Sequence, residues 1–420
     1  MIMSTIVILT GGGDTCALNP TIYGAVSEAR QRGWNVYGAA KGYSGLMGKT
    51  ADLDDFSGVD IRKLTNAELD GIQYTGGSIL RSSRTNPADP KKYPDGSGIA
   101  KCARVLEHYG IDFLVPIGGD DTMGTAAKLS EGPVNAVGVN KTMDNDVKGT
   151  YVCLGFPSTV HYATDFSGGL HSTLKTNGRD AVVYAFGRKA GWAPLATAAW
   201  IDPERPERYP HAVLVPELGE LTEERIIEVF DRLKTRHGYA QLVVSEGVAI
   251  KGLADDPELL VRTYGPEVLD DFGHANLKVV NVPLRVAEIV RDHLGLEGKV
   301  DRESNVLYRN CDYNMRSGPP TEVDRELAMA AGRHAVELLA DGVEGRMVNI
   351  TAHGDIAAGC GVGSVPFSEV SGGRTLDAGM YDPQIMLPTR QFTEYVAPFA
   401  PNPRGFRLFD GELPKVSPVR

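Results

Sequence analysis

The sequence predicts an α/β protein of two domains, each built on a mainly parallel sheet, and three observations predict it. The first is length, because 420 residues exceed what one ordinary hydrophobic core contains. The second is an alternation of short aliphatic runs with helix-like segments, which is the βαβ rhythm of a parallel sheet covered on both faces. The third is a set of Gly-rich or acid-rich turns that follow the strands, because open parallel sheets bind ligands at the carboxyl ends of strands.

The first set of elements occupies the N-terminal part of the chain. A β-branched run at residues 5–9 ends in three glycines, and a helix-like segment follows it. The pattern then repeats with apolar runs that favour strands. Strands are predicted at 5–9, 34–40, 111–119 and 134–140, and helices at 19–33 and 96–110.

A second set of strands and helices follows. Thr222 is the expected N-cap of one helix, and Glu223 and Glu224 then fall in its first turn, where the helix dipole favours negative charge. The C-terminal residues are rich in Pro and Gly and only weakly periodic. Strands are predicted at 180–187, 212–217 and 240–247, and helices at 221–238, 284–295 and 321–342.

Composition excludes several classes of partner. A net charge of -11 argues against nucleic acid or an anionic membrane as the main partner. The apolar N-terminal run is short and lacks a basic flank, so we expect a first strand and no signal peptide or membrane span. The cysteine count is odd and no pair has metal-ligand spacing, which favours reduced thiols and a cytoplasmic location.

Three turns combine residues that suit phosphate chemistry. In "LTGGGDTCALNP" at 9–20, glycines allow backbone N–H groups to approach an anion, although the motif lacks the Rossmann spacing and the P-loop lysine. In "GGDDT" at 118–122, a carboxylate can hold Mg²⁺ beside a phosphate. In "NKTMDND" at 140–146, a carboxylate can accept a proton from an attacking hydroxyl, and Lys141 can neutralise a phosphate. Each could instead be a polar turn or cap, but together they favour phosphoryl transfer.

Several arginines lie beside predicted turns. A single surface arginine is usually solvated, but several beside glycine turns can grip phosphate through bidentate hydrogen bonds. The arginines in question are Arg81, Arg84, Arg179, Arg188 and Arg316.

With these motifs in order, the chain resembles the phosphofructokinases, which phosphorylate fructose 6-phosphate. The resemblance runs from residue 9 to about 345 and rests on "LTGGGD…LNP", "GYSGL", "GGS…SSRTNP", "GGDDT", "KTMDND", "GRKAGW", "SEG" and "MRSGPPTEVDR". It implies two Rossmann-like domains with the active site in the cleft between them. The donor domain would comprise residues 1–155 plus about 315–365, and the sugar-phosphate domain residues 156–314. Residues 366–420 would form an extension that wraps the chain or contacts a partner subunit.

The resemblance also implies roles for matching positions. Asp144 is similar to the base that activates the sugar hydroxyl, Thr142 and Arg84 to contacts of the transferring phosphoryl group, and Asp120 to the Mg²⁺ ligand. Arg179 is similar to an arginine that a neighbouring subunit lends, which implies a homodimer or homotetramer with shared sites. The other matches are donor-binding Gly12, Asp121, Thr122 and Lys141, and substrate-binding Asp146, Phe186, Gly187, Arg188, Glu246, Tyr313 and Arg316.

Two positions resemble the pyrophosphate-using members of the family. ATP-using members resemble "GGDG" and "GTIDND", whereas this chain has Asp121 and Lys141 at the variable positions. Asp121 adds bulk and a charge facing the α-phosphate of ATP, a repulsion of roughly several kcal/mol at low effective dielectric. Lys141 can contact the short donor and balance that charge. Asp121 is therefore expected to disfavour nucleotide.

Some positions depart from the family pattern. Cys16 and Ala17 replace Pro and Gly and add a side chain near the donor site, Arg81 replaces a common Gly, and Phe186 changes the wall of the sugar pocket. "GFPSTV" replaces the usual "GFDTA". The second subunit-crossing arginine has two candidates, Arg302 and Arg309. These departures leave the acceptor open, and a longer sugar phosphate such as sedoheptulose 7-phosphate is an alternative.

The sequence therefore predicts a pyrophosphate-dependent phosphofructokinase with Mg²⁺ as cofactor. The reaction would convert fructose 6-phosphate to fructose 1,6-bisphosphate and phosphate, reversibly. One alternative is an ATP-dependent kinase of the same fold. A second is a catalytically silent regulatory subunit or sugar-phosphate sensor, although Asp144, Asp120 and Arg84 are all retained.

Overall fold

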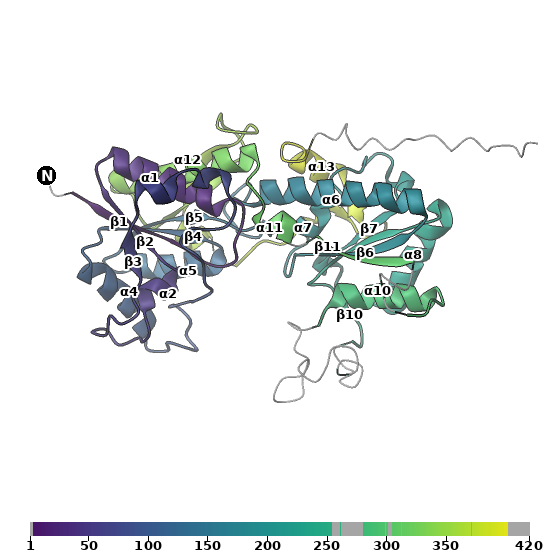
Figure 1. The fold of residues 1–420 in the computed structure, drawn as a ribbon, viewed down its shortest axis with the longest axis horizontal. Coiled ribbons are helices and arrows are strands. Elements are labelled where there is room, and N and C mark those ends of the chain that lie inside the picture. The colour runs from purple at the N-terminus through teal and green to yellow at the C-terminus, as the bar shows by residue number, and fades with distance from the viewer. Residues whose placement is uncertain are drawn as a thin grey trace, which may run out of the picture.

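The computed structural model describes residues 3–253, 261, 280–298, 300, 305–311, 313–370 and 372–401. It contains two α/β domains that lie end to end (Figure 1). Each is built on its own sheet, and the strands of both sheets are mainly parallel. The predicted fold class is therefore confirmed. Among the described residues, no helix combines the length and the apolar character needed to cross a bilayer.

The first domain contains a seven-stranded sheet in the order β13-β12-β5-β4-β1-β2-β3. Two edge strands, β3 and β13, are antiparallel to their neighbours, and the five strands between them pair in parallel. The strands are β1 (Thr5–Thr10), β2 (Asn35–Ala39), β3 (Ile61–Lys63), β4 (Phe113–Gly118), β5 (Asn135–Asn140), β12 (Arg346–Thr351) and β13 (Gly361–Pro366).

Helices cover both faces of this sheet. Successive side chains of a strand point to opposite faces, so each strand contributes apolar residues to both of the cores that the helices complete. Ile6 and Ile8 of β1 belong to the core that includes helix α1 (Leu18–Gln31) and helix α12 (Glu322–Ala340). Val7 and Leu9 belong to a separate core on the opposite side. The helices on that side are α2 (Tyr43–Met47), α4 (Ser97–His108) and α5 (Asp120–Ser130), and short α3 (Asn66–Leu69) lies near the β3 edge.

The second domain has a four-stranded parallel sheet in the order β11-β6-β9-β7. Helices α6 and α10 lie on opposite sides of it (Figure 1), and α8 packs beside α10. The predicted N-cap is confirmed, because the Thr222 side chain accepts a hydrogen bond from the Arg225 amide. The elements are β6 (Asp180–Ala185), β7 (His211–Leu214), β8 (Glu220–Leu221), β9 (Gln241–Ser245), β10 (Ala249–Ile250), β11 (Val306–Cys311), α6 (Phe156–Asn177), α7 (Trp192–Ala196), α8 (Glu223–His237) and α10 (Val282–His293).

The long helix α6 has no counterpart among the predicted elements, because its sequence is rich in Ser, Thr and Gly, which lower helix propensity. In the structure some of these hydroxyls bond back to carbonyls one turn earlier, as Thr159 does to Gly155 at 2.9 Å and Thr176 to Ser172 at 2.8 Å. Strands β11, β12 and β13 and helix α5 are also additional to the predicted elements. Packing between α6 and the domain core outweighs the weak local preference.

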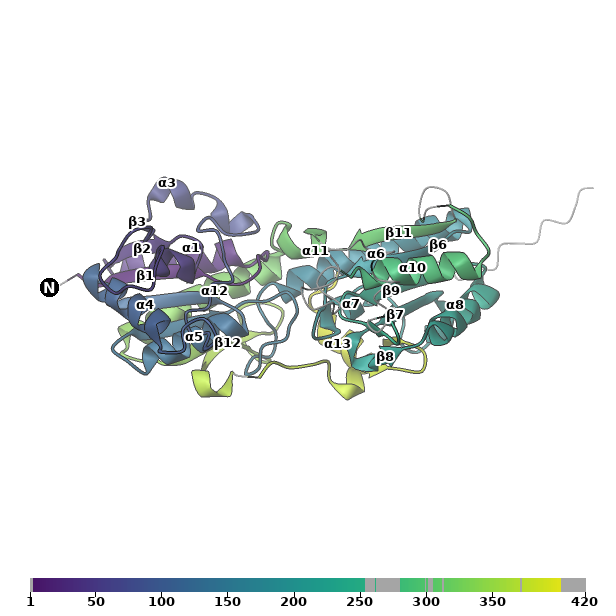
Figure 2. The same cartoon turned by 90° about the horizontal axis from the view of Figure 1, so that it is seen from below.

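The chain crosses between the domains three times. It passes from β5 to α6, returns through α11 (Tyr313–Ser317) to α12, and crosses again after β13. Figure 2 shows the third crossing and the C-terminal elements beside β7, where Tyr381 Oη donates to the Val213 carbonyl at 2.7 Å. These last elements are β14 (Tyr381–Asp382), β15 (Leu387–Pro388) and α13 (Arg390–Val396). Residues 376–399 thus contact the second domain of the same chain, and residues 402–420 lie outside the described part.

Candidate active site

The three predicted phosphate-binding turns meet at one edge of the first sheet. Strands β1, β4 and β5 are neighbours and parallel, so their carboxyl ends point the same way. The turns are also bonded to one another. The Gly11 amide donates to the Ile117 carbonyl at 2.9 Å, and the Lys141 amide donates to the Gly118 carbonyl at 2.8 Å. This edge faces the second domain.

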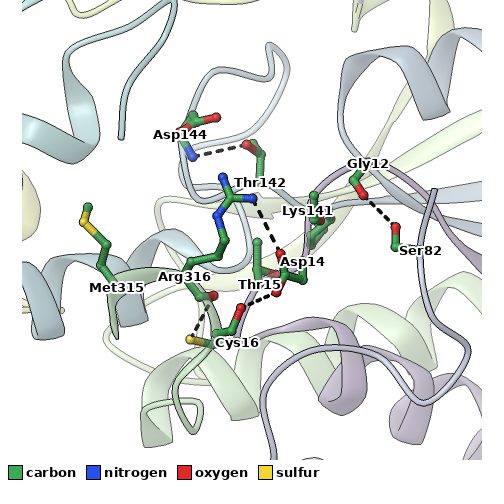
Figure 3. A network of polar contacts seen from close by, with 12 residues as sticks. Gly12, Asp14, Thr15, Cys16, Ser82, Lys141, Thr142, Asp144, Met315 and Arg316 are labelled. Atoms are coloured by element: carbon green, nitrogen blue, oxygen red, sulfur yellow. Dashed lines mark hydrogen bonds and ion pairs between the residues drawn. The ribbon is translucent and has the colours of Figure 1, made fainter. Parts of the chain in front are cut away.

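The glycine loop, residues 11–13, is held by the segment that precedes Arg84. The Gly12 amide donates to the Ser83 carbonyl at 2.9 Å, and Ser82 Oγ donates to the Gly12 carbonyl at 2.7 Å (Figure 3). Gly12 has φ +81°, a conformation that favours glycine. The loop and the exposed Arg84 therefore lie side by side, as the predicted grip on a phosphoryl group requires.

Thr122 has a packing role in this loop. Its side chain is buried against Gly11 and Gly118, where an added Cβ would overlap the Thr122 side chain. Glycine is thus needed at both positions because Thr122 fills the space. Donor contact by Thr122 stays a prediction.

Lys141 lies beneath the glycine loop and is almost fully buried. Its Nζ donates to the carbonyl oxygens of Gly11, at 3.2 Å, and of Gly13. Burial, and to a smaller degree the nearby charge of Arg316, lower the pKa of Lys141 to about 8, against the attraction of Asp14 and Asp144. Lys141 therefore orients the loop and supplies a positive charge below it.

Asp120 and Asp121 begin helix α5, so they are not in a free turn as the sequence suggested. Both side chains are solvent-accessible in the first turn, where the helix dipole favours anions. Partial burial raises the pKa of Asp120, and the charges of Asp121 and Asp146 raise it further. The charge of Asp146, from the loop that follows β5, therefore acts on Asp120.

The Asp144 loop, residues 141–154, leaves β5 and enters the second domain. Thr142 Oγ1 accepts a hydrogen bond from the Asp144 amide at 3.1 Å, which shapes the turn (Figure 3). Burial raises the pKa of Asp144 to about 6, helped by Asp146 and opposed by Arg316. Burial also raises the pKa of Asp146, while its own backbone amide and the Thr142 hydroxyl lower it. With a pKa of about 6, the Asp144 carboxyl is ionised near neutral pH and can accept a proton.

The second domain presents residues that follow three adjacent strands. Phe186, Gly187 and Arg188 follow β6, Glu246 follows β9, and Tyr313 follows β11. Tyr184 Oη, on β6, donates to Glu246 Oε2 at 2.7 Å. These predicted sugar-binding residues thus share one edge of the second sheet.

Aromatic rings line this edge. The Phe186 ring packs edge-on against Tyr184, with centroids 5.6 Å apart, and against Tyr313, at 6.3 Å. The Arg316 guanidinium lies over the Phe186 ring at 4.3 Å. Phe186, which the sequence predicts to alter the wall of the sugar pocket, therefore adds an aromatic ring and a cation–π contact at this edge.

Arg316 connects the two halves of the site. Its Nη1 pairs with Asp14 Oδ1 at 3.6 Å, and Ser317 Oγ donates to Asp14 Oδ2. In Figure 3 the guanidinium lies between Asp14 and Asp144. Arg316 lowers the pKa values of Lys141 and Asp144, although it is not the largest influence on either, so its charge acts on both predicted groups.

Some predicted residues are not part of this assembly. Arg179 precedes β6, at the end of the sheet opposite to Gly187 and Arg188; six extended residues separate the two ends by about 20 Å. Arg309 lies on edge strand β11, where Nη1 donates to the Tyr308 carbonyl at 2.8 Å. Arg302 lies outside the described residues.

Of the departures near the donor side, Cys16 and Ala17 are buried and Arg81 is exposed. Cys16 and Ala17 are fully buried, so their side chains face the core and not an open donor site. Cys16 Sγ donates to the Arg316 carbonyl at 3.5 Å, and burial raises the pKa of its thiol to about 12. Arg81 has φ +58° and is exposed, and its carbonyl accepts from Thr10 Oγ1 at 2.6 Å.

Three residues of the site were missed in the sequence. Lys189 lowers the pKa values of Asp120 and Asp146 as a secondary influence, and Asp14 and Tyr184 partner Arg316 and Glu246. Lys189 and Asp14 lie inside the quoted motifs "GRKAGW" and "LTGGGD", so position could have suggested both. Nothing in the sequence around Tyr184 distinguishes it from a core residue of a strand.

Comparisons with known proteins identify the family of this chain. Residues 5–339 match the family described as Phosphofructokinase. A pyrophosphate–fructose 6-phosphate 1-phosphotransferase from Amycolatopsis methanolica is 35% identical over 347 residues, covering 81% of this chain and 89% of the relative. An ATP-dependent 6-phosphofructokinase 3 from Bacteroides thetaiotaomicron is 32% identical, covering 87% and 92%. A solved pyrophosphate-dependent phosphofructokinase from Nitrosospira multiformis has a similar fold, with a TM-score of 0.71 at 23% identity, covering 94% and 91%.

Proposed function

Because this chain belongs to the phosphofructokinase family, we propose that it transfers a phosphoryl group from pyrophosphate to O1 of fructose 6-phosphate. The products are fructose 1,6-bisphosphate and phosphate, and the reaction is reversible. One observation carries the proposal. A partly buried carboxyl, Asp144, whose pKa is raised to about 6 mainly by burial, lies on the same side of the site as the Arg316 guanidinium, which pairs with Asp14 next to the glycine loop (Figure 3).

Asp144 is the proposed general base. It accepts the O1 proton as that oxygen attacks the terminal phosphorus of pyrophosphate, and the bond from that phosphorus to the bridging oxygen breaks. Thr142 contacts the moving phosphoryl group, and Arg84 and Lys141 offset the negative charge of that group. Positioning and charge stabilisation of this kind are the main contributions of a protein to phosphoryl transfer.

The substrates are assigned to separate domains. Pyrophosphate is held by the first domain, through Gly12, Asp121, Thr122 and Lys141. The sugar phosphate is held by the second domain, through the residues at its strand ends and Tyr313, with Arg316 on the 6-phosphate. The donor domain is residues 1–155 plus about 315–365, and the acceptor domain is residues 156–314.

The carboxylates present fit Mg²⁺ as cofactor. Asp120 is solvent-accessible at the start of α5, and the charge of Asp146 helps to raise its pKa after the larger effects of burial and of Asp121. Across the described residues, no group of three or more His, Cys, Asp or Glu could hold a metal by itself. Mg²⁺ is typically held by one or two carboxylates together with substrate phosphate oxygens. Bound Mg²⁺ would supply charge neutralisation for the donor phosphates.

Pyrophosphate is preferred as donor for two reasons. Asp121 stands exposed at the start of α5, where its charge would face the α-phosphate of ATP. The relative from Amycolatopsis methanolica also has pyrophosphate in its name. An ATP-dependent reaction is the second candidate, because the relative from Bacteroides thetaiotaomicron is named ATP-dependent at similar identity.

A homodimer or homotetramer is proposed for the working enzyme. The supporting observation is the position of Arg179 at the opposite end of β6 from the site. A neighbouring subunit can supply that arginine to the 6-phosphate. A cytoplasmic location is proposed as well, since all five cysteines are free and buried.

The test is phosphorylation of fructose 6-phosphate by pure protein with Mg²⁺, comparing pyrophosphate with ATP. We expect turnover with pyrophosphate only. Turnover with ATP only would assign the donor to nucleotide. Turnover with neither calls for sedoheptulose 7-phosphate as acceptor, and binding of sugar phosphate without any turnover would support a silent sensor.

A further inference from the structure

The Asp144 loop is an irregular crossing between two domains. Its backbone groups cannot be satisfied by a helix or sheet, so they need other partners. Asn145 stands between the two aspartates and has φ +53°, a left-handed conformation that asparagine adopts more readily than most residues. Because Asp144 and Asp146 flank it, the conformation of Asn145 sets the direction of both carboxylates.

Every polar group of the Asn145 side chain has a partner. Its Oδ1 accepts from the Cys153 amide at 2.9 Å, within the same loop. Its Nδ2 donates to Tyr395 Oη at 2.9 Å. The backbone carbonyl of Asn145 accepts a hydrogen bond from Arg374 Nε at 2.6 Å. Tyr395 and Arg374 belong to the C-terminal part of the chain, which therefore supplies two of these three bonds.

The Arg374 guanidinium spans the base of the loop. Its Nη1 donates to the Thr150 carbonyl at 3.0 Å and its Nη2 to the Tyr151 carbonyl at 3.2 Å. Its own amide donates to the Asp146 carbonyl at 2.7 Å. A planar group with donors in fixed directions can serve three carbonyls at once, which a lysine ammonium cannot reproduce.

Tyr395 completes the contact from helix α13. Its Oη donates to the Tyr151 carbonyl at 2.8 Å while accepting from Asn145. The ring is buried among aromatic neighbours, with its centroid 5.5 Å from that of Trp192. Trp192 also stacks beneath Arg374 at 4.9 Å. Both C-terminal residues are thus fixed by the second domain while they hold the loop.

We propose that Arg374 and Tyr395 are positioning residues, which hold Asn145 so that Asp144 and Asp146 face the reacting groups. The proposal rests on the proposed role of Asp144 as base. Both residues lie beyond residue 339, where the family match ends. The C-terminal segment that contains them, residues 374–395, would then contribute to catalysis even though it contacts neither substrate.

The first test is Tyr395→Phe, with Tyr381→Phe as matched control. Each variant removes one buried hydroxyl of the C-terminal segment that donates to a backbone carbonyl, but Tyr381 bonds to Val213, away from the loop. We expect kcat of Tyr395→Phe to fall about tenfold, with both KM values within about twofold, since misplaced groups slow chemistry more than binding. Tyr381→Phe should keep its kcat. Unchanged kcat in Tyr395→Phe would overturn the proposal.

A second pair of variants tests the guanidinium. Arg374→Gln should lower kcat by about 10²-fold, and Arg374→Lys should recover little of it. The control is Arg232→Gln, because Arg232 bonds the Gln384 and Ile385 carbonyls and so fastens the same segment without contacting the loop. Equal loss of kcat in both Gln variants would show that attachment of the segment matters and loop geometry does not, which contradicts the proposal.

Asp144→Asn, assayed in parallel, separates the two proposals. Full activity in Asp144→Asn would remove the proposed base, whatever the C-terminal variants do. Loss in Asp144→Asn with normal kcat in Tyr395→Phe and Arg374→Gln would keep the base and reject the positioning residues.

Discussion

The two sides of the candidate site are built differently. On the first domain, the glycine loop presents backbone groups, and its shape is fixed by buried Lys141 and Thr122. On the second domain, the edge presents side chains, among them Phe186 and the largely exposed Tyr313. A site made of backbone tolerates few changes of shape, whereas a site made of side chains can change with one substitution. The proposed donor side is therefore the constrained half, and the proposed acceptor side the adaptable one.

The largest expected effect is at the point where the two sides meet. Asp144→Asn removes the proposed base while keeping the size of the side chain, and kcat should fall about 10²–10⁴-fold. Steady-state assays with saturating substrates would measure it. Asp112→Asn, which alters a carboxylate bonded to the Thr5 amide at the far end of the sheet, is the control. A variant with near-normal kcat would remove Asp144 from its role.

The next effect separates the donor side from the acceptor side. Lys141→Met removes a buried charge and its hydrogen bonds to the Gly11 and Gly13 carbonyls. Charge-assisted bonds contribute enough that kcat/KM for pyrophosphate should fall roughly 10²-fold, with little change in KM for the sugar phosphate. Lys101→Met is the matched control, because buried Lys101 donates to the Asp52 and Asp55 carbonyls away from the site. Equal effects on both KM values would erase the proposed division between domains.

The dependence of activity on pH should have an acid limb and an alkaline limb, each set by the ionisation of one group. Asp144, with a pKa raised mainly by burial to about 6, must be ionised to accept a proton, so activity should decline below pH 6. Lys141, with a pKa lowered mainly by burial to about 8, must stay protonated, so activity should decline above pH 8. Each limb should fall about tenfold per pH unit. If the alkaline limb is absent from the Lys141→Met variant, Lys141 is the group that causes it. If the alkaline limb persists in this variant, another group causes it.

The smallest effect is expected on the adaptable side. Phe186→Met removes the ring under the Arg316 guanidinium, a contact of about 0.5–1 kcal/mol at accessible sites. KM for the sugar phosphate should rise a few-fold, and the ratio between fructose 6-phosphate and sedoheptulose 7-phosphate should shift. Phe56→Met provides the control, because Lys101 lies over that ring at 4.7 Å, away from the candidate site. An unchanged ratio would mean that Phe186 does not select the acceptor.

The sequence predicted best what repeats locally. Strands at 5–9 and 134–140, and the turns that follow them, are visible because apolar runs end abruptly in Gly, Asp or Lys. Helix α6 was missed because its stability comes from packing and from Ser and Thr bonding back to carbonyls. The contacts of Arg374 with Asn145 could not be predicted either, since 229 positions separate them and only the fold brings them together. Local pattern thus revealed the groups proposed for the chemistry, and tertiary structure revealed what holds them.

The three crossings have a mechanical consequence. Any movement of the two domains apart to admit a sugar phosphate must be absorbed by the three segments that join them. One of those segments is the Asp144 loop itself, and another contains Arg374, to which the loop is bonded. The proposed base therefore lies on a segment that joins the two domains. A change in the angle between the domains would also change the orientation of the Asp144 carboxylate. A substrate that brings the two domains closer together would, by the same movement, orient the proposed base toward the attacking hydroxyl.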